Sequence, residues 1–360
     1  MKNKIIEVQA TTEKTNYSYS AKNESFLDGL IIPYFVRPLL KVFPYGIPAN
    51  IITIFSNTLV FLSFLIAMQA TRGSYFLWFL IPVFIVTYVI GDCMDGEQAR
   101  RTKTGSPLGE FLDHFLDTFV TGVLIISIIA AYDVKNPFIT YIILFISYVT
   151  QATTFWEKFK KHKMHFGKFS STETILSLAL IITLAFFKPI RDFVSQNLGS
   201  FDFVQNSFLS SCNAVVNLTV MELVLVVMSV FAIINIVGTL IRSGGASIRY
   251  WMYLVFTAAV TIIMASADVH YYHLPFLTLS LLNIYYISGL LVAIVMKKND
   301  PYPDFVLPVV LTVLFALKVE SPVVSIVSLV YIFVSVVIRA TIFFVQNKKY
   351  WVWKNPKPEN

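Results

Sequence analysis

The sequence predicts an all-α integral membrane protein of about ten transmembrane helices, preceded by an amphipathic helix in the membrane interface. Hydrophobic residues make up 56% of the 360-residue chain and charged residues only 14%, and the mean hydropathy is +0.69. Apolar stretches of the roughly 20 residues that a bilayer requires recur along the chain. Lys and Arg residues gather on alternate loops between these stretches. A soluble domain carries about 25% charged residues, so a soluble protein is excluded.

The expected elements follow one another with short connections. Residues 1–24 form a polar N-terminus without the apolar core of a signal peptide. Residues 25–45 are apolar but interrupted by prolines and basic residues, which favours an interfacial helix over a span. The predicted spans are 50–70, 74–91, 113–132, 136–156, 171–188, 218–241, 249–266, 273–296, 303–317 and 322–345. Residues 347–360 form a polar tail.

The distribution of basic residues predicts the orientation. Across ten crossings, 22 of the 28 Lys and Arg residues fall on one side and five on the other. Basic residues favour the cytoplasmic side, so both termini are predicted to be cytoplasmic. This bias also accounts for the formal charge of +7 without a nucleic-acid partner. The two cysteines have no metal-ligand spacing.

Four aspartates between the second and third predicted spans carry the strongest chemical signal. Residues 91–120 read GDCMDGEQARRTKTGSPLGEFLDHFLDTFV. Asp92 and Asp95 are three residues apart, and Asp113 and Asp117 are four apart, so each pair shares one helix face. Carboxylates held close together near a bilayer repel one another unless cations are present. Two Mg²⁺ or Mn²⁺ ions would meet that need, and such a pair recurs in phosphoryl transfer. The alternative is a solvated acidic helix end.

The same segment resembles the CDP-alcohol phosphotransferase family. It matches the family motif D-x2-D-G-x2-A-R-x8-G-x3-D-x3-D at all eight fixed positions, which are Asp92, Asp95, Gly96, Ala99, Arg100, Gly109, Asp113 and Asp117. GEQARRT, SPLGE, the Asp113–His114 pair and PANIIT at 48–53 resemble the choline/ethanolamine phosphotransferase branch. So does the stretch from 155 to 173, where Ser170 replaces the branch's Asp. Phe115 and Leu116 replace its Gly and Cys, so the head group stays open.

The resemblance implies a role for each matching residue. The four aspartates would bind two divalent ions, and Gly96, Ala99, Arg100 and Gly109 would form the CDP pocket. Arg100 is also explained as a cytoplasmic anchor.

Four further residues have a proposed function, and some of them also have a structural interpretation. Asn50 and Thr53 share a helix face and would contact the nucleotide, although Asn50 also suits a helix cap. His114 would be the base that deprotonates the acceptor alcohol, with Asp117 as the competing base. Glu173 would orient or relay that proton, or would simply complement a helix dipole.

The implied protein is therefore a membrane enzyme of phospholipid synthesis. It would move phosphocholine or phosphoethanolamine from CDP-choline or CDP-ethanolamine to a lipid hydroxyl such as diacylglycerol, releasing CMP. Residues 46–188 would form the catalytic core and 189–346 additional helices. A homodimer is expected, in a bacterial inner membrane or the endoplasmic reticulum, with the active site facing the cytoplasm.

Two alternatives and two unexplained residues stay open. A CDP-diacylglycerol enzyme with a soluble alcohol acceptor would share the motif. A cation-coupled transporter would explain the spans and the acidic cluster, but not the Gly, Ala and Arg positions. Glu222 and Arg339 fall inside predicted spans, where ionisable residues are usually functional or paired.

Overall fold

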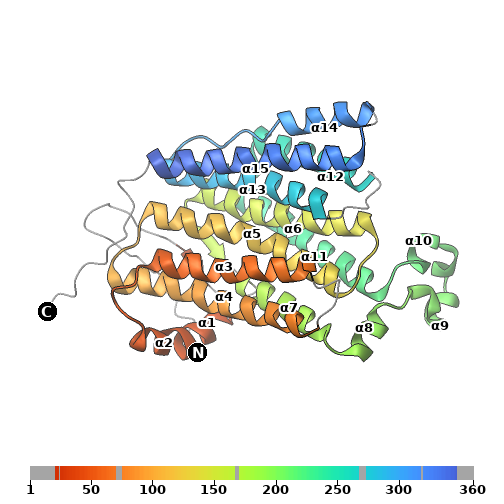
Figure 1. The fold of residues 1–360 in the computed structure, drawn as a ribbon, viewed down its shortest axis with the longest axis horizontal. Coiled ribbons are helices and arrows are strands. Elements are labelled where there is room, and N and C mark those ends of the chain that lie inside the picture. Colours follow the sequence, from red (N-terminus) through yellow and green to blue (C-terminus); the bar gives the residue numbers. More distant parts are fainter. Residues whose placement is uncertain are drawn as a thin grey trace.

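The computed structural model describes residues 21–23, 25–69, 75–166, 170–266, 273–317 and 319–346. Helices dominate this part of the chain, which confirms the predicted all-α membrane fold (Figure 1). Residues 1–20 and the tail 347–360 lie outside the described residues. Ten helices follow the predicted spans in order: α3 (Ala49–Gln69), α4 (Tyr75–Thr102), α5 (Pro107–Ala131), α6 (Pro137–Lys161), α7 (Ser171–Leu184), α11 (Val220–Ser243), α12 (Ile248–Ser266), α13 (His273–Met296), α14 (Val306–Ala316) and α15 (Ser321–Gln346).

Not every one of these ten helices is long enough by itself to cross a membrane. Eight of these helices are long and apolar enough to cross a membrane. The other two, α7 and α14, have 14 and 11 residues. At 1.5 Å per residue they measure about 21 and 17 Å, short of a hydrocarbon core of about 30 Å. α7 forms a broken or re-entrant pair with α8 (Lys188–Val194), bent by 103°. The described residues therefore contain eight candidate spans, or nine with that pair.

Local sequence explains both short helices. Pro189 lies in the first turn of α8, where it favours the start of a new helix. Asp304 accepts a hydrogen bond from the backbone N–H of Leu307 at 2.8 Å, so α14 begins after the prolines at 301 and 303. The residues between α7 and α8, 185–187, are apolar, so hydropathy alone does not reveal that break.

The predicted interfacial helix is present at the N-terminal side of α3. It comprises α1 (Asp28–Ile31), a π-helical turn (Ile32–Val36) and α2 (Arg37–Val42). Val36 and Leu40 are buried against the protein, whereas Tyr34 and Val42 are exposed. One face thus packs on the bundle and the other is available to the membrane interface, as the amphipathic pattern predicts.

Short elements complete the described chain. Strand β1 (Ala21–Asn23) pairs in parallel with β2 (Met164–Phe166), which ties the N-terminal segment to the loop after α6. Four one-turn helices connect α8 to α11 and lie together at one end of the bundle (Figure 1). They are η3 (Leu198–Ser200), α9 (Asp202–Gln205), η4 (Phe208–Ser211) and α10 (Asn213–Val216).

Close packing of α3 and α4 fixes the position of the acidic motif. A Cβ on Gly91 would lie 2.7 Å from Cβ of Ser56, so only glycine allows this approach. Helix α3 also packs on α5, while α5, α6 and α13 pack against one another in the interior of the bundle. Asp92 follows Gly91 directly, and its helix is therefore held at a fixed distance from α3.

A short turn joins α4 to α5 and makes them antiparallel. Ser106 caps α5 by accepting a hydrogen bond from Gly109 N at 3.0 Å, and Pro107 occupies the first helical position. At the end of α4, Gln98 donates to the carbonyl of Ile47 at 2.8 Å and Arg101 to that of Leu40 at 2.6 Å. These bonds fasten the acidic end of α4 to the segment that leads into α3.

Candidate active site

The structure brings the four predicted aspartates together. Single carboxylate oxygens of Asp92, Asp95 and Asp113 lie within 4.8 Å of one another. A second group, whose ligand atoms lie within the same distance of one another, contains Asp113, Asp117 and a ring nitrogen of His114. Asp113 belongs to both groups and therefore joins the end of α4 to the start of α5.

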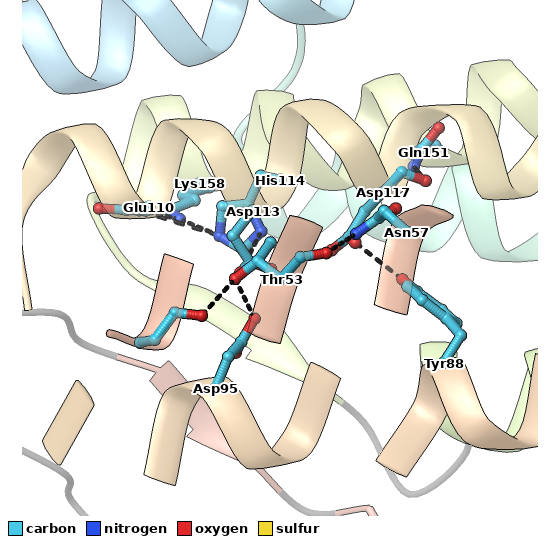
Figure 2. Close-up of polar contacts among 11 residues, drawn as sticks. Thr53, Asn57, Tyr88, Asp95, Glu110, Asp113, His114, Asp117, Gln151 and Lys158 are labelled. Atoms are coloured by element: carbon cyan, nitrogen blue, oxygen red, sulfur yellow. Dashed lines mark hydrogen bonds and ion pairs between the residues drawn. The ribbon is translucent and has the colours of Figure 1, made fainter. Parts of the chain in front are cut away.

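Two hydrogen bonds hold Asp95 and Asp117 in place (Figure 2). Thr53 of α3 donates its hydroxyl proton to Oδ2 of Asp95. Tyr88 of α4 donates to Oδ1 of Asp117 at 2.7 Å. Neutral donors orient these carboxylates without cancelling their charge, so the cluster stays negative.

Asp113 has one carboxylate oxygen that lacks a hydrogen-bond donor in the described part of the chain. Its Oδ1 atom is buried and accepts no hydrogen bond from any residue that the structure describes. An unsatisfied buried carboxylate oxygen is costly, and a divalent cation bound to oxygen ligands would remove that cost. The four aspartates therefore fit a pair of Mg²⁺ or Mn²⁺ ions. Oxygen-only donors favour these hard ions over softer metals.

Arg100 lies on the same face of α4 as Gly96. Its guanidinium is 3.5 Å from the place that a Cβ on Gly96 would occupy. Arg100 Nη2 pairs with Oε1 of Glu97 at 2.9 Å, and about one third of the Arg100 side chain is exposed. A partly exposed guanidinium beside a glycine has room to turn towards an anionic ligand.

Asn50 and Gly109 face each other across the α3–α5 contact. Asn50 is buried, and its Oδ1 atom is 3.0 Å from where a Cβ on Gly109 would stand. Asn50 lies inside α3 rather than before it, so it is not the cap that sequence alone allowed. Ala99 is partly exposed on α4 and its carbonyl accepts a bond from Thr104 N.

A buried lysine beside His114 was missed by the sequence reasoning. The lysine run at 158–168 suggested topogenic charges, but Lys158 is only 5% exposed. Its ammonium pairs with Glu110 and lies 3.0 Å from Nε2 of His114 (Figure 2). Because an ammonium only donates, Nε2 accepts and the histidine proton is assigned to Nδ1. Nδ1 faces Oδ2 of Asp113 at 3.7 Å.

Helical spacing could have identified this lysine. Gln151, Phe155 and Lys158 lie at i, i+4 and i+7 of α6, and Gln151 and Phe155 also contact α5. Lys160 and Lys161 lie off this stripe and are exposed. Tyr88, from an otherwise apolar run, gave no comparable signal.

Glu173 serves as a structural anchor in the described contacts. It forms a capping box with Ser170 at the start of α7, accepting from Ser170 N at 2.8 Å. Its other carboxylate oxygen accepts from Ser25 Oγ at 2.7 Å and Leu27 N at 2.9 Å. Both oxygens of Glu173 are thus engaged with donors, and its predicted role in proton relay stays a prediction.

Glu222, the first unexplained acid, also caps a helix. Thr219 precedes α11, and Glu222 accepts from Thr219 N at 2.8 Å in a capping box. Its position at the start of a span therefore has a structural reason.

Comparison with known proteins gives a consistent result. Residues 47–209 match the family model described as CDP-alcohol phosphatidyltransferase. The chain is 27% identical to "Ethanolaminephosphotransferase 1" of Homo sapiens over 159 residues, 40% of each chain. It is 26% identical to "Cholinephosphotransferase 1" of Saccharomyces cerevisiae over 161 residues, covering 42% of this chain and 40% of that protein. The human "Cholinephosphotransferase 1" is 29% identical over 182 residues, with 48% and 43% covered. The matches thus span less than half the length of these relatives.

Proposed function

Because residues 47–209 form a CDP-alcohol phosphatidyltransferase domain, we propose that this protein transfers a phospho-alcohol from a CDP-alcohol to a lipid hydroxyl in phospholipid synthesis. The donor would be CDP-choline or CDP-ethanolamine, the acceptor diacylglycerol or a similar lipid alcohol, and CMP the second product. The names of the similar transferases support this choice of head groups.

The proposal rests on the cluster of aspartates from α4 and α5, in which one oxygen of Asp113 has no hydrogen-bond donor among the described residues. Asp92, Asp95, Asp113 and Asp117 would hold two Mg²⁺ or Mn²⁺ ions. Bound there, the ions would neutralise the diphosphate and the charge that develops at its β-phosphorus. A CDP-alcohol site needs such cations, because an acidic cluster without them would repel the negatively charged diphosphate of the substrate.

The remaining residues would bind and orient the substrates. Arg100 would turn from Glu97 to the diphosphate, because a guanidinium forms paired hydrogen bonds with phosphate oxygens. Asn50 and Thr53 of α3, with Gly96, Ala99 and Gly109, would line the nucleotide pocket. The glycines leave space for close approach of a ligand to the backbone.

The attacking lipid hydroxyl has to lose a proton, and His114 is the proposed acceptor. Its Nε2 lone pair is held towards Lys158 at 3.0 Å, so Lys158 would withdraw towards Glu110 as the proton arrives. The hydroxyl oxygen then bonds to the β-phosphorus, and the bond between that phosphorus and the bridging oxygen of the diphosphate breaks. The bridging oxygen keeps the electron pair and leaves as part of CMP. Asp117 is the competing base.

The placement in the membrane follows from the charged loops. The acidic cluster lies near the end of α4 whose last turn carries Arg100 and Arg101, with Lys103 directly after the helix. Basic residues favour the cytoplasmic side, which supports an active site open to cytoplasmic CDP-alcohol. The family resemblance also supports a homodimer, which sedimentation in detergent would test.

A product assay with separate donors tests the proposal. Purified protein in vesicles containing diacylglycerol would receive labelled CDP-choline or CDP-ethanolamine, with Mg²⁺ or Mn²⁺. We expect labelled phospholipid, lost with EDTA and in Asp113→Asn, and retained in the control Asp192→Asn, which removes an exposed carboxylate of α8. Product only from CDP-diacylglycerol and a soluble alcohol would contradict the donor assignment. Absence of product with every donor would contradict the proposed transferase activity.

A further inference from the structure

A cavity of about 430 Å³ lies between α13 and α15, on helices that do not carry the acidic cluster. It is lined by Tyr285, Val292, Met296, Lys298, Ser335, Ile338, Arg339, Ile342, Phe343 and Gln346. The proposed transfer reaction uses none of these residues.

The cavity combines cationic and apolar walls. Two of its lining residues, Lys298 and Arg339, are basic, and no lining residue is acidic. Asp304, whose charge acts on Arg339, does not line the cavity. Its carboxylate accepts bonds from Leu307 N and the Tyr331 hydroxyl, both at 2.8 Å. The residues that line the cavity therefore carry a net positive charge.

The described contacts of Arg339 involve only part of its guanidinium. The group stacks 3.5 Å from the centroid of the Tyr285 ring, and Nη1 donates to the Tyr285 carbonyl. A Cβ on Gly289 would lie 2.7 Å from Nη1, so a glycine provides the space for this placement. An arginine has five N–H donors. Among the residues that the structure describes, only the Tyr285 carbonyl accepts from this guanidinium, which leaves a planar donor edge that suits a phosphate.

The residues that line the cavity suit a lipid headgroup and its acyl chain. Lys298 follows the end of α13, and Gln346 is the last residue of α15. Arg339 lies seven residues before Gln346, about 10 Å along the helix axis. Val292, Ile338 and Ile342 extend the wall with apolar side chains. Basic residues at the membrane boundary with an apolar wall beside them match a phosphate and its acyl chains.

We propose that this cavity binds an anionic phospholipid, with its phosphate at Arg339 and Lys298 and an acyl chain along Val292, Ile338 and Ile342. Diacylglycerol is uncharged and would gain nothing from these cations. The cavity also touches the helix of the acidic cluster. Phe343 lies 4.1 Å, between ring centroids, from Phe111 of α5, which adjoins Glu110.

Binding can be measured without any enzyme assay. Delipidated full-length protein in a neutral detergent would be titrated with phosphatidylglycerol and examined by native mass spectrometry. Diacylglycerol and inorganic phosphate would be titrated in parallel. We expect tight binding of one phosphatidylglycerol, with at least tenfold weaker binding of the other two. Equal binding of diacylglycerol would overturn the charge assignment, and equal binding of inorganic phosphate would overturn the lipid assignment.

Two exposed positions give variants that should fold normally. Lys298→Gln should weaken phosphatidylglycerol binding about fivefold, since each basic residue near an anionic surface contributes about that factor. Lys297→Gln removes the same charge from a neighbouring residue that does not line the cavity, and should change binding less than twofold. Ile342→Trp, which fills the apolar wall, should also reduce binding. Equal effects of Lys298→Gln and Lys297→Gln, together with unchanged binding in Ile342→Trp, would overturn the proposal.

Discussion

Replacing Lys158 by methionine is expected to destabilise the protein strongly. The lysine side chain is 6% exposed and that of its partner Glu110 is 12% exposed, so the pair is largely withdrawn from water. Two unit charges in contact attract by about 4 to 5 kcal/mol at an effective dielectric constant of about 20. Removing one member leaves the other charge buried without its counter-charge, which typically costs about 3 to 5 kcal/mol. We therefore expect Lys158→Met to lose about 3 kcal/mol of unfolding free energy.

The double variant separates this charge effect from lost packing. Glu110→Gln removes the carboxylate that has lost its counter-charge, so Glu110→Gln/Lys158→Met should be more stable than Lys158→Met alone. Stability would be measured by denaturant unfolding of purified protein in mild detergent. Lys161→Met, which alters an exposed lysine of the same helix, is the matched control.

Two results would refute the reasoning about this pair. The first is an equal, small loss in Lys158→Met and Lys161→Met, which would mean that Lys158 is solvated. The second is strictly additive losses from the two single substitutions, which would mean that Glu110 and Lys158 do not interact.

Three further substitutions test other parts of the site. Asp113→Asn should raise the melting temperature in EDTA, because it removes a buried unsatisfied charge. It should also abolish the rise that Mg²⁺ gives to the parent protein, whereas the same Mg²⁺-dependent rise in the variant would contradict a shared ligand. Tyr88→Phe removes the hydroxyl that bonds Asp117 and should lower kcat/KM about tenfold, as a bond to a charged group is worth about 1.5 to 3 kcal/mol; unchanged kinetics would exclude this orienting role. Gly91→Ala should destabilise the protein by about 1 to 3 kcal/mol through its clash with Ser56. Ser56→Gly should then restore stability, and no recovery would place the strain elsewhere.

The sequence predicted that the four aspartates cluster, because helical spacing encodes this arrangement. Asp92 with Asp95 and Asp113 with Asp117 each share a helix face, and one short turn suffices to bring the two faces together. The family motif added Gly96, Arg100 and Gly109 by position. The structure places Gly96 beside Arg100 and Gly109 beside Asn50.

Features that depend on contacts between distant helices were not predictable from one sequence. Lys158 reads as one of five basic loop residues until α6 is seen to turn it towards His114 and Glu110. The predicted spans 171–188 and 303–317 correspond to the shorter helices α7 and α14, because hydropathy does not register the new helix start at α8 or the cap at Asp304. Glu173 and Glu222 suggested function by their location, yet both complete capping boxes, which are local and visible as S-x-x-E and T-x-x-E in the sequence.

Divalent ion binding tests the proposed active site most directly. Equilibrium dialysis of purified protein against Mn²⁺ would count the ions held per chain, with Asp113→Asn and the control Asp192→Asn measured alongside. The shared position of Asp113 in both groups of ligands predicts two ions in the parent protein and in Asp192→Asn, with loss of tight binding of both in Asp113→Asn. No bound Mn²⁺ in the parent protein, or equal binding in Asp113→Asn, would contradict a two-ion site for a CDP-alcohol.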